Sequence, residues 1–240
     1  MSKKTLAPSV VTTRDKKGLK FMSITGAAYE KAALTEDEAQ LVNEAPGWSD
    51  VVADFIKKHR YAENSPLRKF EIFKSLGVIE VPADYVHATR LADFFQRHQG
   101  GEKKSFYYYN DAITDANFSN PSRVVKPGDK FHVDLVRQVA GGTTSSEERM
   151  AFLAHHHGIH LGAQGASLVF DDKKMRTDLP KGKWYLSFDE KDRLWQDADR
   201  CRRVPLIDAY LGGGFDFGLG YFGESWNDDG CFLLFRDFAK

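Results

Sequence analysis

The stretch KFHVDLVRQV, residues 130–139, decides how the rest of the chain is interpreted. Apolar side chains recur at every second position of its first half, which is the pattern of a β-strand that buries one face. The apolar face carries Phe131, Val133, Leu135 and Val139. The opposite face is polar and presents His132, Asp134 and Gln138. We therefore expect a strand with one face in the core and one polar face.

Similar runs continue toward the C-terminus. The strand-like segments are residues 105–109, 166–170, 183–188, 204–211, 215–221 and 231–235. Between the first strands and the later ones, a capping box among residues 143–148 predicts a single helix that ends near Gly158. Residues 104–240 are therefore predicted to form a mainly antiparallel β domain with one inserted helix, and the strand residues are predicted to share one core.

The preceding part of the chain has helical signals. Thr35 and Glu38 form a capping box, and Ser49 precedes a second amphipathic segment. Ser65 and Pro66 predict the start of a third helix that runs to Leu76, and residues 83–98 fit a fourth. Residues 31–103 are therefore predicted to be a helical part, preceded by a flexible segment, residues 1–30, with one short strand near residues 19–24. A small helical part before a β domain is an α+β arrangement.

The amino-acid composition limits the classes of protein to which this chain can belong. Hydrophobic residues make up 42% of the 240 residues, which favours an ordered core. The formal net charge is zero, which disfavours a nucleic-acid partner without excluding a local basic patch. There are two cysteines, no apolar signal-peptide region and no run long enough to span a membrane. We expect a soluble, cytoplasmic protein that does not associate with membranes.

The sequence AHHHGIH, residues 154–160, is the densest group of metal-ligand side chains. In a continuous helix, His156 and His160 are four residues apart and share one face, as His157 and His160 do at a spacing of three. Gly158 argues against a continuous helix, and the His-Glu-x-x-His pattern of metalloproteases is absent. In the alternative interpretation, the histidines only close a helix, where cationic side chains suit the helix dipole.

The polar face of the first strand offers further ligands. If the connection from strand to helix brings His132 and Asp134 beside His156, His157 and His160, imidazoles and one carboxylate would form a site for zinc, iron or manganese. The leading hypothesis is a non-catalytic binding or interaction module without a cofactor, whose partner is an unidentified protein or small molecule. The alternative is a metal-dependent, hydrolytic enzyme that uses these five residues and a divalent metal such as zinc.

The two interpretations of the histidines predict different mutant behaviour. If they only close a helix, replacing His156 and His160 together changes the free energy of unfolding by about 1 kcal/mol or less, the size of one dipole interaction. This is the result we expect from chemical denaturation. Loss of a bound ion from the double mutant, measured by elemental analysis, would support the metal interpretation instead.

Overall fold

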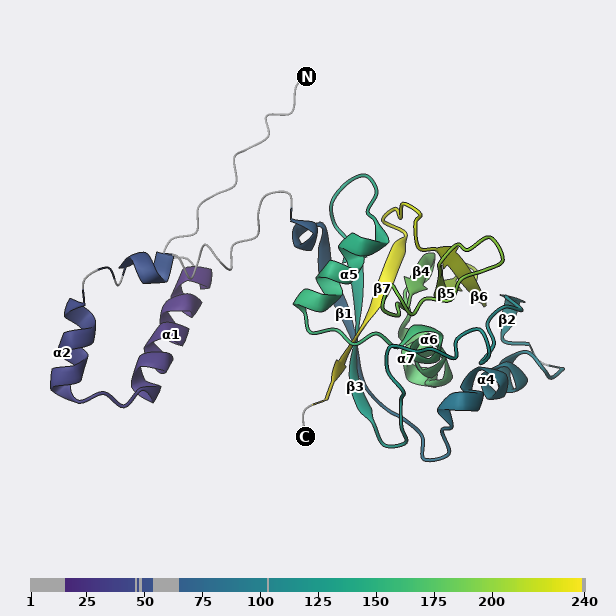
Figure 1. Cartoon of the computed structure of the whole chain (residues 1–240), viewed down its shortest axis with the longest axis horizontal. Coiled ribbons are helices and arrows are strands. Elements are labelled where there is room, and N and C mark those ends of the chain that lie inside the picture. The colour runs from purple at the N-terminus through teal and green to yellow at the C-terminus, as the bar shows by residue number, and fades with distance from the viewer. Residues whose placement is uncertain (1–15, 46, 48, 54–64, 103, 239–240) are drawn as a thin grey trace, which may run out of the picture. The chain divides into compact units, whose positions relative to one another are not determined.

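The computed structural model describes residues 16–45, 47, 49–53, 65–102 and 104–238. The chain divides into two compact units, residues 1–60 and residues 61–240. In the first unit, α1 (Lys16–Lys31) and α2 (Glu36–Glu44) are helices, and residues 49–53 are helical as well (Figure 1). The capping box of Thr35 and Glu38 is confirmed at the start of α2.

One expectation for the first unit is wrong. The strand predicted near residues 19–24 lies inside α1. Leu19 and Met22 are three residues apart, and this spacing places them on one face of a helix, whereas a strand would need alternation. Residues 1–15 of the predicted flexible segment lie outside the described residues, as does most of the helix predicted after Ser49.

The second unit contains a mixed seven-stranded sheet in the order β1-β3-β7-β4-β5-β6-β2. Its strands are β1 (Phe70–Glu80), β2 (Phe106–Tyr109), β3 (Lys130–Gln138), β4 (Lys183–Leu186), β5 (Arg203–Ala209), β6 (Phe215–Tyr221) and β7 (Gly230–Asp237). Neighbouring strands are antiparallel except β4 with β7 and β2 with β6. An α+β fold is therefore present, with a mixed sheet at its centre.

Helices cover both faces of this sheet, so the predicted single core is two cores. Phe131, Val133 and Leu135 belong to one cluster with residues of α4 (Arg90–His98), α6 (Gly162–Asp171) and α7 (Lys173–Asp178). Val136 belongs to a second cluster with Phe152 of α5 (Ser146–His155). Figure 1 shows α5 beside β1 and β3. Of the strand residues expected in one core, Trp184, Leu186, Leu206 and Phe232 lie in or against the second cluster.

Several predicted elements in this unit are wrong. The helix expected from Ser65 to Leu76 is a short 3-10 turn, η1 (Pro66–Lys69), followed by β1. The pairing of β1 with β3 shifts after Ile72 and again after Ser75, so each bulge adds one unpaired residue. Phe70, Leu76 and Ile79 are buried as a result, and the bulges give this strand an apparent period of three.

The strand expected at residues 166–170 lies inside α6, and α5, α6 and α7 occupy the interval between β3 and β4 where one helix was expected. A short continuous apolar run fits a buried helix as well as a buried strand. The helix expected over residues 83–98 is shorter, because a 3-10 turn, η2 (His87–Thr89), precedes α4. The capping box at α5 is confirmed, with Ser145 as its N-cap residue.

Arg149 attaches α5 to the sheet. Its side chain is fully buried, and its guanidinium lies between the rings of Phe70 and Phe232, 5.5 and 5.4 Å from their centroids. It donates hydrogen bonds to the carbonyl oxygens of Gly230 and Asn227 and to the side chain of Gln138. Burial lowers the pKa of Arg149 to about 10, so the group stays charged at neutral pH.

We predict that Arg149→Met lowers the free energy of unfolding by about 3 kcal/mol, because the carbonyl oxygens of Gly230 and Asn227 and the side chain of Gln138 each lose a hydrogen-bond donor. The matched control is Arg137→Met, which removes an exposed ion pair with Glu71 and is expected to cost less than about 1 kcal/mol. Urea denaturation measures both values. Equal costs for the two substitutions would contradict the role given to Arg149.

Candidate functional site

The structure distributes the predicted histidine site over two layers. His132 and Asp134 lie on β3, whereas His156 and His157 follow α5 and His160 lies between α5 and α6. Asp134 is 4% exposed and forms an ion pair with Arg236. Burial lowers the pKa of His156 by more than the charge of Asp134 raises it.

The remaining histidines have other surroundings. The ring centroids of His132 and Phe238 are 4.9 Å apart, and those of His156 and Phe152 are 4.3 Å apart. Burial lowers the pKa of His156 and of His160, which keeps both imidazoles neutral near pH 7. His157, rather than Gly158, adopts the left-handed backbone conformation that ends α5, with φ of 55°.

Within the described ranges, no three His, Cys, Asp or Glu side chains are grouped closely enough to hold a metal ion. Asp134 already has a cationic partner in Arg236, which competes with a metal for its oxygens. The metal site of His132, Asp134, His156, His157 and His160 stays a prediction.

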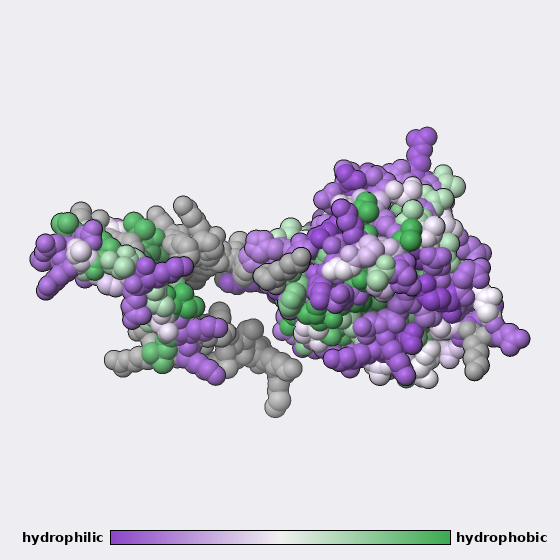
Figure 2. Space-filling model, turned by 90° about the horizontal axis from the view of Figure 1, so that it is seen from below, coloured by the Kyte–Doolittle hydropathy of each residue, from purple (hydrophilic) through white to green (hydrophobic). Residues whose placement is uncertain are grey.

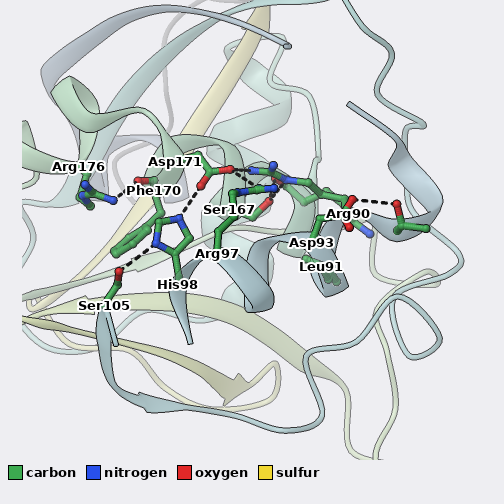
Figure 3. A network of polar contacts seen from close by, with 12 residues as sticks. Arg90, Leu91, Asp93, Arg97, His98, Ser105, Ser167, Phe170, Asp171 and Arg176 are labelled. Atoms are coloured by element: carbon green, nitrogen blue, oxygen red, sulfur yellow. Dashed lines mark hydrogen bonds and ion pairs between the residues drawn. The ribbon is translucent and has the colours of Figure 1, made fainter. Parts of the chain in front are cut away.

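A different cluster of polar side chains joins α4 to the C-terminal end of α6. The carboxylate of Asp171 lies between His98 on one side and the guanidinium groups of Arg90 and Arg97 on the other (Figure 3). The oxygens of Asp171 are 2.6 Å from Nη2 of Arg90, 2.7 Å from Nη2 of Arg97 and 2.5 Å from Nε2 of His98. We call these four residues the Asp171 cluster.

The position of Asp171 explains why it needs these partners. It is the last residue of α6, where the helix dipole is negative and a carboxylate is unfavourable. His98, Arg90 and Arg97 of α4 offset this cost. Burial alone would raise the pKa of Asp171, but these three groups together lower it to about 2. The carboxylate is therefore ionised at every pH near neutrality.

The other end of α4 is also fixed by a distant carboxylate. Both oxygens of Asp115 accept hydrogen bonds at 2.9 Å, one from the backbone N–H of Leu91 and one from that of Ala92. These donors would otherwise be free at the start of the helix. Arg90, beside them, is 5% exposed and donates from Nε to the Ser167 hydroxyl at 2.7 Å. Two carboxylates from other parts of the chain thus hold α4 at both ends.

A pocket of about 500 Å³ opens beside the Asp171 cluster. Arg90, Arg97 and Asp171 form part of its wall, and Tyr85 and Gln96 add polar groups. The remaining lining residues are Pro82, Asp84, Val86 and Asp93. The guanidinium of Arg90 also lies 5.5 Å from the ring centroid of Tyr85. Guanidinium and carboxylate groups therefore line the same pocket.

Ser105, His98 and Asp171 are connected as Ser, His and Asp are in many hydrolases. The hydroxyl of Ser105 is 3.0 Å from Nδ1 of His98, whose Nε2 contacts Asp171. Two features argue against a nucleophile here. Asp171 shares its charge with two guanidinium groups, and Ser105 is not among the residues that line the pocket. The contacts of Ser105 and His98 are those of a structural link between α4, β2 and α6.

Sequence reasoning missed the Asp171 cluster. Arg97 and His98 were visible only as cations in the last turn of a predicted helix, and Asp171 as the start of a polar turn. Residues 98 and 171 are 73 positions apart, so no local spacing relates them.

Comparison of the chain with known proteins found no matching family, no matching curated protein and no matching solved structure. No helix in the described ranges is long and apolar enough to cross a membrane.

The Asp171 cluster predicts a specific acid sensitivity. Because the pKa of Asp171 is depressed in the folded state, its contribution to stability is present above the unfolded value near 3.8 and is lost as pH falls toward about 2. After allowance for solvent screening, this contribution is about 1–2 kcal/mol. Asp171→Asn should therefore lose less stability than the wild-type chain between pH 5 and pH 2.

The measurement is urea denaturation at a series of pH values, with Glu71→Gln as the control for an exposed ion pair. If Asp171→Asn and the wild-type chain lose stability in parallel over this range, the assigned ion pairs do not act as described.

Proposed function

We propose that the chain is a non-catalytic binding module and that the pocket beside the Asp171 cluster takes a small zwitterionic molecule. The observation that carries the proposal is the presence of both charge signs in one pocket wall. Arg90 and Arg97 supply positive charge, and Asp84 and Asp93 supply negative charge beyond that of Asp171. A volume of about 500 Å³ lies within the range of small-molecule sites.

The guanidinium groups suit an acid group of the ligand. A guanidinium has five N–H donors, more than the contacts with Ser167 and Asp171 use. The side chain of Arg97 is 47% exposed and is therefore accessible, whereas Arg90 acts from a buried position where its charge is screened less. A carboxylate or phosphate is the group that such donors bind most strongly.

The two remaining carboxylates suit a cationic group. Asp93 accepts a hydrogen bond from the Thr89 hydroxyl on one oxygen, which orients the side chain. An ammonium group near Asp84 and Asp93 would offset the repulsion that a simple anion meets from them. A molecule with an acid group and an amine a few bonds apart, of the size of an α-amino acid, fits both sets of charges.

Binding without catalysis is supported by the protonation states of the pocket. General acid–base catalysis needs a group whose pKa lies near the working pH. The ion pairs lower the pKa of Asp171 to about 2, and burial raises the pKa of the Tyr85 hydroxyl well above its usual value. Both groups therefore keep one protonation state near pH 7. The metal-dependent hydrolytic alternative stays a prediction.

The test is isothermal titration calorimetry with α-amino acids, and with acetate and methylammonium as the two half-molecules. We expect at least one amino acid to bind about tenfold more tightly than either half-molecule. Arg97→Gln should weaken that binding about tenfold or more, because a charge-assisted hydrogen bond is lost. Arg137→Gln, in an ion pair with Glu71 on β1, should leave it unchanged.

Two results would count against the proposal. One is that no amino acid gives a heat of binding at concentrations up to about 10 mM, because a functional site should bind its ligand more tightly than that. The other is binding that Arg97→Gln and Arg137→Gln weaken equally, because the two charges then have no separate roles.

A further inference from the structure

The helices of the N-terminal unit expose most of their apolar side chains. No residue of α2 is buried, and the described side chains of α1 are all exposed. Figure 2 shows the resulting apolar patches on this unit, in green. Among the described residues of this unit, the large apolar side chains that are exposed are those of Leu19, Phe21, Met22, Ile24, Tyr29, Leu41 and Val51. Apolar surface of this extent on two adjacent helices marks an interaction surface.

Few side chains of this unit are shielded from solvent in the described part of the chain. Leu34, Ala39 and Val42 are half-buried, and Asn43 donates a hydrogen bond to the Tyr29 hydroxyl at 3.4 Å. Ile24, at 60% exposure, and Leu41, at 71%, remain in solvent. In the described part of the chain, Ile24 and Leu41 are thus left exposed and are available for contact with another molecule.

The charges of the two helices are opposite. The sequence of α1 contains Lys16, Lys17, Lys20 and Lys31 and a single carboxylate, that of Glu30. Helix α2 has no basic residue, and its carboxylates are Glu36, Asp37, Glu38 and Glu44. A surface that contains both signs in separate helices is complementary to itself when one copy is turned by 180°, as in a twofold symmetric dimer.

We propose that the N-terminal units of two copies of this chain associate, with α1 of each copy against α2 of the other. Ile24 and Leu41 then leave water, and the lysines of one copy face the carboxylates of its partner. An anionic membrane is a poorer occupant, because the four carboxylates of α2 lie next to the lysines of α1 and would be repelled by it.

The first test measures the mass of the full chain by sedimentation equilibrium. We expect a monomer–dimer equilibrium with a Kd on the order of 10 µM. Ile24→Glu and Leu41→Glu should each weaken the dimer about tenfold or more, because a charge is placed in the apolar contact. The matched control is Leu211→Glu in the larger unit, at a leucine that is 83% exposed, which should leave the Kd unchanged.

The second test exchanges the charges and does not depend on the apolar contact. One variant carries Lys16→Glu, Lys20→Glu and Lys31→Glu, and the other carries Glu36→Lys, Asp37→Lys and Glu44→Lys. Each variant alone has like charges on both helices and should stay monomeric. Mixed in equal amounts, they should form a heterodimer, because each α1 then meets an α2 of opposite charge.

Three outcomes would overturn the proposal. The first is that the wild-type chain stays a monomer at about 100 µM, ten times the expected Kd. The second is that a dimer forms but survives both Ile24→Glu and Leu41→Glu. The third is that the chain is monomeric and sediments with vesicles of phosphatidylserine and phosphatidylcholine, and that Ile24→Glu releases it, which would assign the surface to a membrane.

Discussion

The carboxylate of Asp171 is the constraint on which the candidate site depends. It stands at the negative end of the α6 dipole, so it is stable there only with cationic partners. Arg90, Arg97 and His98 supply them from α4, 73 to 81 residues earlier in the chain. Without Asp171, the guanidinium of Arg90, in a residue only 5% exposed, would lose its counter-charge. The same contacts place two guanidinium groups in the wall of a pocket.

The larger unit is held together by a second buried cation that acts differently. Arg149 has its hydrogen bonds to carbonyl and amide oxygens, not to a carboxylate. Its position between Phe70 of β1 and Phe232 of β7 joins α5 to the sheet on the face opposite to α4 and α6. One face of the sheet thus carries a structural cation that is fully enclosed, and the other carries the cations that reach a pocket.

Features set by neighbouring residues could be predicted from the sequence. The strand at residues 130–138 and the helix starts at Thr35 and Ser145 depend on side chains within a few positions of each other. Strand β1 could not be predicted in this way, because its two bulges arise from pairing with β3, which lies some 60 residues later. Helix α6 could not either, since its continuous apolar run reflects burial on all sides rather than a period.

The same distinction separates the two candidate sites. The histidine cluster is conspicuous in sequence because its members are adjacent, but the structure places them at the end of one helix and in the link to the next. The Asp171 cluster is assembled by the packing of α4 on α6 and leaves no local pattern in the sequence.

A direct measurement of the proposed site is the NMR signal of the arginine Nε–H groups during titration with an amino acid. We predict that the signals of Arg90 and Arg97 shift together while that of Arg149 stays fixed. Unchanged Arg90 and Arg97 signals at saturating ligand would contradict binding at this pocket.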